Sequence, residues 1–215
     1  EDRTLLSVTS LFFNGDLTII SDDADAIVVR EDPLQTGRVE ILVGNSVGGT
    51  VTYTPDTSIG ALDATAVETI LVRGGDGRND IDLGDRLGMG GVSSTVFSNL
   101  TSVTIEGRNG NDTITGTIDF GDVINGGHGE DLITVGTAGV TVDAGDGNDT
   151  VVGSPAADVI NGGDGNDSID AGDGADTVDA GNGHDFVNGG DETTGLGDRI
   201  TGGHGHDTLH GGDGD

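Results

Sequence analysis

The chain has 215 residues and a formal net charge of -31, because 39 acidic side chains face only 8 basic ones. So large a negative charge repels nucleic acids and anionic membrane surfaces and favours a cation as partner. The absence of cysteine excludes disulfides and thiol chemistry, and no apolar stretch approaches the roughly 20 residues that span a bilayer. We therefore expect a monomer that binds no nucleic acid and does not insert into membranes.

Residues 1–106 are predicted to form an irregular all-β segment. Short stretches rich in β-branched residues alternate with Asn, Asp, Gly and Pro turns, and no helical periodicity is sustained. The predicted strands are Asp16–Ile20, Ala26–Glu31, Arg38–Val43, Thr50–Thr54, Val67–Val72 and Ser102–Glu106. We expect this segment to cap or continue the structure that follows it, because the end of a stacked sheet exposes unpaired strand edges.

Residues 107–215 carry a nine-residue repeat. Three consecutive copies, which begin at Gly162, Ala171 and Ala180, read GGDGNDSID, AGDGADTVD and AGNGHDFVN. Positions 1, 2 and 4 are mostly glycine, position 6 is aspartate and position 8 is aliphatic. A degenerate copy at residues 74–82 has Asn79 at position 6, the stretch 116–125 is one residue too long, and the copy at Gly189 holds four extra residues.

This period predicts a stack of short strands rather than a helix. One apolar residue in nine cannot line the apolar face of an amphipathic helix, but it can line a thin core if each copy is a turn followed by a strand. Consecutive copies would lie on opposite sides, so that a full coil takes two copies and every second strand is a neighbour at about 4.8 Å. Ile160 would then lie between Val142 and Val178.

The turns of such a stack would be rich in oxygen. Glycine permits backbone conformations with positive φ, and a turn of this kind directs its carbonyl oxygens to one side while position 6 adds a carboxylate. Two stacked turns would enclose a cage of oxygens. Calcium takes six to eight oxygen ligands in a tolerant geometry, whereas magnesium demands a strict octahedron. The sequence therefore favours Ca²⁺ as the bound cation.

The pattern G-G-x-G-x-D-x-U-x resembles the RTX family, the haemolysin-type calcium-binding repeats, which form a right-handed parallel β-roll. The resemblance covers residues 107–215 well and 74–82 weakly. It implies that one turn gives the carbonyls of positions 2 and 4 and its aspartate, while the next turn on the same side gives the carbonyls of positions 1 and 3 and its own aspartate. Gly163, Gly165 and Asp167 would thus pair with Ala180, Asn182 and Asp185.

The same rule gives the whole set of expected ligands and an estimate of about seven ions. The expected ligand residues are Asp112, Gly126, Gly127, His128, Gly129, Asp131, Ala144, Gly145, Asp146, Gly147, Asp149, Asp158, Gly162, Gly163, Asp164, Gly165, Asp167, Ala171, Gly172, Asp173, Gly174, Asp176, Ala180, Gly181, Asn182, Gly183, Asp185, Gly189, Asp191, Asp198, Gly202, His204 and Asp207. We expect no ion beside Val140, which takes position 6 of its copy, and expect the GSPAAD turn at 153–158 at most to close a row.

Other readings of the repeats are weaker. A flexible acidic linker would not keep an aliphatic residue at position 8, the helices of an EF-hand are missing, and a phosphate-binding loop needs a lysine. The histidines could suggest a transition-metal site, but His128 and His204 at position 3 and His184 and His206 at position 5 are expected to face solvent. We predict no catalytic residues, because short turns on a thin solenoid build no deep pocket.

The sequence predicts a calcium-binding structural module. The RTX resemblance implies that the module belongs to a secreted or cell-surface bacterial protein and that it folds outside the cell. Two alternatives stay open. One is an accessory module of a larger extracellular enzyme, which would bind an extracellular polysaccharide or a cell-surface partner through the exposed sheet faces. The other is a non-catalytic fragment of such an enzyme.

Overall fold

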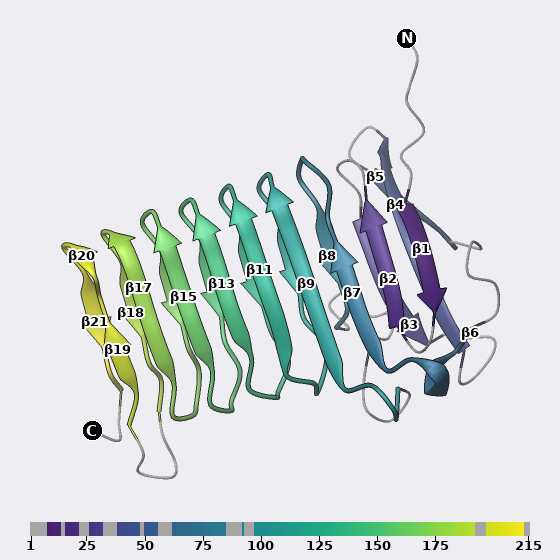
Figure 1. The fold of residues 1–215 in the computed structure, drawn as a ribbon. Helices are drawn as coiled ribbons and strands as arrows, with labels where there is room; N and C mark the ends of the chain where they lie inside the picture. The colour runs from purple at the N-terminus through teal and green to yellow at the C-terminus, as the bar shows by residue number, and fades with distance from the viewer. Residues whose placement is uncertain are drawn as a thin grey trace.

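The molecule consists of two β-sheets that lie face to face along one axis (Figure 1). The structure, a computed structural model, describes residues 8–13, 16–21, 26–31, 38–47, 50–55, 62–84, 92, 97–191 and 197–212. Within these ranges it contains strands, turns and one short 3-10 turn at Ala64–Ala66, and no α-helix. No described helix is long and apolar enough to cross a membrane. The predicted all-β class is confirmed.

From β7 to β19 the strands alternate between the two sheets along the chain. The first sheet contains β1 (Val8–Phe13), β2 (Asp16–Ser21), β7 (Thr69–Arg73), β9 (Ser102–Asn109), β11 (Asp122–His128), β13 (Thr141–Asp146), β15 (Val159–Asp164), β17 (Thr177–Gly183), β19 (Arg199–Thr201) and β20 (His204–Gly205). The second contains β3 (Ala26–Glu31), β4 (Arg38–Val47), β5 (Thr50–Pro55), β6 (Leu62–Asp63), β8 (Asp80–Asp82), β10 (Thr113–Thr115), β12 (Leu132–Thr134), β14 (Thr150–Val152), β16 (Ser168–Asp170), β18 (Phe186–Asn188) and β21 (Thr208–His210).

The repeats form the predicted parallel stack. Ile160 pairs with Val142 on one side and with Val178 on the other, so two copies make one coil, as the period predicts. The extra residue in 116–125 is absorbed in the turn before β11, since Ile105 still pairs with Ile124. The four extra residues after Gly189 leave the pairing of Val178 with Ile200 intact.

The strands of the N-terminal segment add to the same two sheets. β2 and β3 pair in parallel with β7 and β8 and so extend the stack. Beyond them the direction changes, because β1 pairs with β2, and β4 with β3, in the antiparallel sense. All six strands predicted in this segment are present, and β8 is the strand of the degenerate copy at 74–82, whereas the prediction missed β1 and β6.

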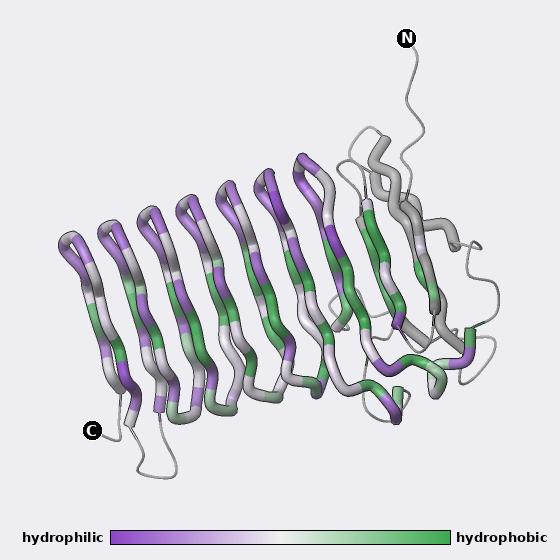
Figure 2. The backbone as a smooth tube through the Cα atoms, in the orientation of Figure 1, coloured by the Kyte–Doolittle hydropathy of each residue, from purple (hydrophilic) through white to green (hydrophobic). Residues whose placement is uncertain are grey.

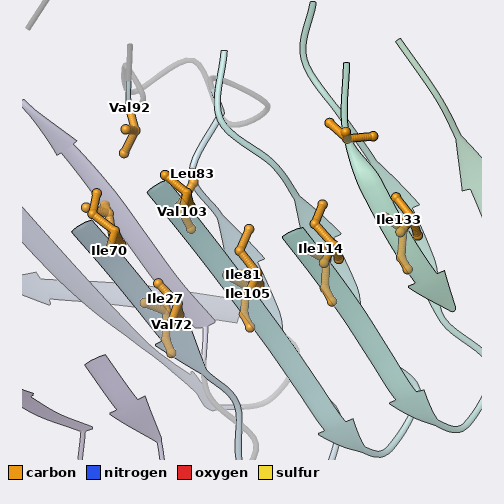
Figure 3. Close-up of a cluster of buried hydrophobic side chains, with 14 of the residues drawn as sticks. Ile27, Ile70, Val72, Ile81, Leu83, Val92, Val103, Ile105, Ile114 and Ile133 are labelled. Atoms are coloured by element: carbon orange, nitrogen blue, oxygen red, sulfur yellow. The ribbon is translucent and has the colours of Figure 1, made fainter. Parts of the chain in front are cut away.

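The core is a thin apolar layer between the sheets. Ile27, Ile81, Ile114, Ile133 and Val151 are buried along the second sheet, and Ile70, Val72, Val103 and Ile105 along the first; most of these appear in Figure 3. In the repeats three positions point inward: the aliphatic residue at position 8, the small residue at position 1 and the aspartate at position 6. Figure 2 shows the result as an apolar band along the strands and hydrophilic turns at the upper edge.

Replacement of a position 8 residue tests this stack. The change Ile160→Ala removes a side chain that is 1% exposed and leaves a cavity between Val142 and Val178. We expect the calcium-saturated protein to lose about 2–5 kcal/mol of unfolding free energy in a urea titration. The adjacent Val159→Ala, at a side chain that is 51% exposed, should cost less than about 1 kcal/mol. Similar losses in both variants would contradict the stacked core.

Candidate metal-binding turns

Two rows of turns join the sheets, one along each long edge of the roll. The first edge, at the top of Figure 1, holds the turns that lead from the first sheet to the second. Its turns are 74–79, 107–112, 126–131, 144–149, 162–167, 180–185 and 202–207. The second edge holds the turns 116–122, 135–140, 153–158, 171–176 and 189–198, of which 192–196 lie outside the described residues. We call the space between two successive turns of one edge a gap.

Glycines at positions 2 and 4 allow successive turns to approach closely. Gly163 and Gly165 have φ values of 104° and 138°, which side chains rarely adopt. A Cβ on Gly163 would lie 2.0 Å from the carbonyl oxygen of Gly145, and a Cβ on Gly165 would lie 1.6 Å from that of Gly147. The carbonyls of positions 2 and 4 therefore point along the stack into the gap ahead of their own turn.

The position 6 aspartates of the first edge form a continuous row. In each case Oδ1 accepts a hydrogen bond from the backbone N–H at position 6 of the preceding turn. The donor to acceptor distances are 2.8 Å for Asp112 to Asp131, 2.8 Å for Asp131 to Asp149, 2.9 Å for Asp149 to Asp167, 2.9 Å for Asp167 to Asp185 and 3.1 Å for Asp185 to Asp207. These hydrogen bonds hold each carboxylate against the preceding turn.

The second carboxylate oxygen faces other oxygens. Within the described ranges, no hydrogen-bond donor reaches Oδ2 of Asp112, Asp131, Asp149, Asp167, Asp185 or Asp198, although these atoms are buried. A point 2.6 Å from Oδ2 of Asp167, where Gly162 would carry its Cβ, lies only 2.4 Å from the carbonyl oxygen of Ala180. The turns at Gly126 and Gly107 show the same convergence of aspartate and carbonyl oxygens. Such a set of hard oxygens fits Ca²⁺.

The electrostatics of the row agree with this fit. Burial, together with the charge of neighbouring carboxylates, raises the pKa of Asp131, Asp149 and Asp167 to about 6. The hydrogen bonds from the backbone lower these pKa values, but by less. Burial also raises the pKa of Asp112. These carboxylates are therefore costly to ionise in the folded chain unless a cation lies beside them.

Part of the second edge is closed by the protein itself. The backbone N–H of Ser154 donates to Oδ2 of Asp158 at 2.7 Å, and its hydroxyl donates to Oδ1 at 2.9 Å. In the same way, the backbone N–H of Thr117 donates to Oδ2 of Asp122 at 2.6 Å, and its hydroxyl donates to Oδ1 at 2.8 Å. In the turn between them, the side chain of Val140 has no oxygen, and its backbone N–H donates to Oδ1 of Asp158. The carboxylate oxygens of Asp158 and Asp122 therefore already have hydrogen-bond donors. The sequence analysis did not identify Ser154 and Thr117 as these donors.

The other predicted ligand residues lie where their repeat positions place them. Position 3 side chains are exposed at His128, Asp146, Asp164, Asp173, Asn182 and His204, so their backbone carbonyls alone face the stack. The turn 171–176 is the neighbour of 189–198, since the N–H of Asp176 donates to Asp198 at 2.9 Å.

His184 and His206 stack on the solvent side with ring centroids 5.4 Å apart. Among the described residues, no three His, Asp or Glu side chains converge on one point, so any cage here also needs backbone carbonyls.

Comparison with known proteins agrees with this geometry. The family model of the RTX calcium-binding nonapeptide repeat matches residues 106–138, 143–178, 162–193 and 197–215. Neither the curated proteins nor the solved structures give a significant match. The matched segments are those in which the β-roll turns carry the aspartate row, so the chain belongs to the RTX family of calcium-binding repeat proteins through residues 106–215.

Proposed function

We propose that this protein is a calcium-dependent structural module in which ions fill the gaps between successive turns and thereby drive the folding of the repeats. One observation carries the proposal. The buried Oδ2 atoms of Asp112, Asp131 and Asp167 on the first edge have no hydrogen-bond donor within the described residues, yet each lies close to a carbonyl oxygen of the next turn. In a stable fold such oxygens need a cation, because buried polar groups without partners cost free energy.

Each ion would take its ligands from the two turns that border its gap. Between the turns 162–167 and 180–185, we assign the carbonyls of Gly163 and Gly165 and the carboxylate of Asp167, together with the carbonyl of Ala180 and the carboxylate of Asp185. The carbonyl of Asn182 already accepts the N–H of Gly165 at 2.8 Å and would complete the set by its second lone pair. The oxygen positions described above support this assignment.

The same assignment extends to five first-edge gaps, from 107–112 onwards, and to the gap between 171–176 and 189–198 on the second edge. Because Ser154 satisfies both oxygens of Asp158, we do not assign an ion between 153–158 and 171–176. The proposal is therefore about six ions, one fewer than the sequence alone suggests.

Calcium binding would make folding depend on the calcium concentration around the protein. The net charge of -31 opposes compaction, and the repeats bury little apolar surface, so the ion-free repeats cannot offset their ordering entropy. Binding free energy then becomes folding free energy. We propose that residues 107–215 order outside the cell, where calcium is plentiful, and that residues 1–106 cap the roll. The module itself would carry out no catalysis.

Calcium-dependent folding is the direct test of this proposal. In EGTA the far-ultraviolet circular dichroism of the repeats should be that of an expanded chain, because the carboxylates repel one another. Millimolar Ca²⁺ should restore a β spectrum, and Mg²⁺ at the same concentration should do far less, since it holds its waters more firmly. An unchanged β spectrum in EGTA would contradict the proposal.

The pH dependence should have opposite signs with and without calcium. Because the pKa of Asp131, Asp149 and Asp167 is raised from 3.8 to about 6, the ion-free fold binds protons more tightly than the unfolded chain. Its stability is thus greatest below about pH 4 and falls as the pH rises through about 6. In EGTA, acidification from pH 7.5 to 5 should increase the β signal.

With calcium present, the same protons compete with the ion. Repeats that acid has ordered must release one proton for each ligand carboxylate that ionises, so at pH 5 each such carboxylate should weaken calcium binding to the folded repeats about tenfold relative to the fully ionised site. Isothermal titration with calcium at pH 5, in two buffers of different ionisation enthalpy, measures the protons released. Calcium binding to the ordered repeats without proton release would show that these carboxylates are not ligands.

Two aspartates of one turn separate ligation from overall charge. Asp167 is 3% exposed and borders two gaps, so Asp167→Ala should reduce the bound ions by one or two and raise the calcium midpoint several-fold. Asp164 is exposed, and its carboxylate accepts a hydrogen bond from the side chain of Asn182. Asp164→Ala therefore changes the charge equally, keeps the backbone carbonyl and should stay close to the wild type. Isothermal titration of both variants measures ion number and affinity. Matching curves would refute the ligand assignment.

A further inference from the structure

The first gap of the first edge, between the turns 74–79 and 107–112, differs from the gaps that follow. Position 6 of its leading turn is Asn79, which is fully buried. Its backbone N–H donates to Oδ1 of Asp112 at 2.6 Å, so the turn is in register with the aspartate row. The change from carboxylate to amide is the chemical difference at this position.

The side-chain amide of Asn79 fills the space between the two turns. Its Nδ2 donates to the carbonyl oxygen of Gly77 at 2.8 Å, to that of Gly75 at 3.2 Å and to Oδ1 of Asp112 at 3.2 Å. These oxygens are the counterparts of the carbonyls at positions 2 and 4 and of the following aspartate, which we assign to calcium in the later gaps. One amide group therefore meets three oxygens of the ligand set.

The nitrogen also lies where the later turns have an oxygen. A Cβ on Gly74 would lie 2.8 Å from Nδ2 of Asn79 and 2.6 Å from the carbonyl oxygen of Gly107. The corresponding point at Gly162 lies 2.6 Å from Oδ2 of Asp167 and 2.4 Å from the carbonyl oxygen of Ala180. The geometry is shared, but a hydrogen-bond donor replaces an acceptor.

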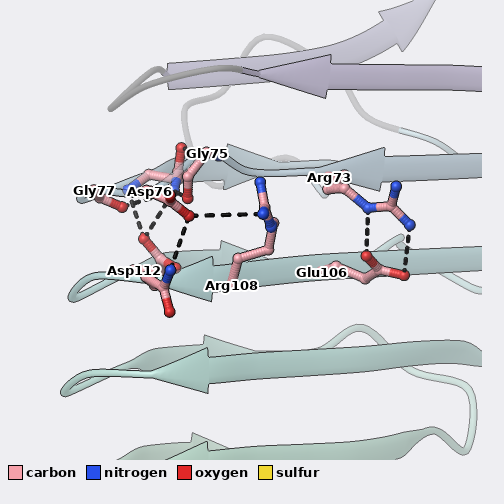
Figure 4. Close-up of polar contacts among 9 residues, drawn as sticks. Arg73, Gly75, Asp76, Gly77, Glu106, Arg108 and Asp112 are labelled. Carbon is pink, nitrogen blue, oxygen red and sulfur yellow. Dashed lines mark hydrogen bonds and ion pairs between the residues drawn. The ribbon is translucent and has the colours of Figure 1, made fainter.

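Basic side chains accompany this exchange. Arg108 holds a φ of 83° at a position that is glycine in most copies, and its guanidinium lies 3.7 Å from the carboxylate of Asp76. Arg73 forms a two-pronged ion pair with Glu106 on the adjoining strands (Figure 4). Asp76 and Glu106, the surface carboxylates beside the first gap, thus have arginine partners.

We propose that Asn79 takes the place of a calcium ion, so that the first gap closes without metal and gives the calcium-dependent turns a preformed edge to stack on. This inference rests on the proposed function for the later gaps. Asn79 would thus determine where the row of ions begins. The proposal also predicts that β7, β8 and the turn between them are ordered before calcium binds.

The test converts the first gap into a calcium site. The change Asn79→Asp should add one bound ion per chain at calcium saturation, measured by equilibrium dialysis. In EGTA it should lower the amide protection of residues 69–82 at least tenfold, because oxygens then face oxygens, and calcium should restore it. The matched control is Asn111→Asp, an exposed change whose Oδ1 can still accept from the N–H of Glu130, and it should alter neither quantity. An unchanged ion number with unchanged protection would overturn the proposal.

The reverse exchange covers the case in which Asn79→Asp fails to fold. Asp167→Asn places an amide in a later gap, so it should bind one ion fewer yet keep a calcium midpoint closer to the wild type than Asp167→Ala. Equal midpoints for these two variants would overturn the proposal. Failure of the proposed function is distinguishable, because a wild type that bound no calcium could still show protected amides at residues 69–82 in EGTA.

Discussion

The structure depends on how oxygen atoms are neutralised between stacked turns. Parallel stacking every 18 residues places carbonyls and carboxylates of two turns in the same narrow gap. The glycines permit this approach, and the thin core of position 8 residues keeps the turns in line, but neither supplies a positive charge. A cation of suitable size would supply this charge, and calcium tolerates the irregular oxygen cage that the backbone offers.

Three solutions to this one constraint occur along the chain. Asn79 satisfies the oxygens of the first gap with an amide, and Ser154 and Thr117 satisfy aspartates of the second edge with N–H and hydroxyl groups. The remaining first-edge gaps have no such donor within the described residues. These departures from the repeat lie at turns whose oxygens have donors within the protein, and under our proposal they remove the need for an ion there. They would confine the ions mainly to one edge of the roll.

The periodic features of the fold could be predicted from the sequence, because they repeat at a fixed spacing. The position of Ile160 between Val142 and Val178 follows from the spacing alone. The partners of Asn79 could not be found in this way, since Asp112 lies 33 residues away, across an insertion that breaks the period. Nor did the pattern reveal that Ser154 satisfies Asp158, because its hydroxyl acts through local turn geometry. The sequence signal of such a closed turn is an amide or hydroxyl residue at a position that most copies give to glycine or aspartate, as at Asn79, Ser154 and Thr117.

The central claim concerns the location of the ions, and diffraction from crystals grown in calcium tests it most directly. Anomalous difference maps should show peaks in the first-edge gaps from the turns 107–112 and 126–131 onwards, each beside Oδ2 of a position 6 aspartate, and none in the gap that Asn79 closes. Peaks confined to the outer faces of the sheets, or gaps bridged by hydrogen bonds alone in a calcium-saturated crystal, would contradict the account.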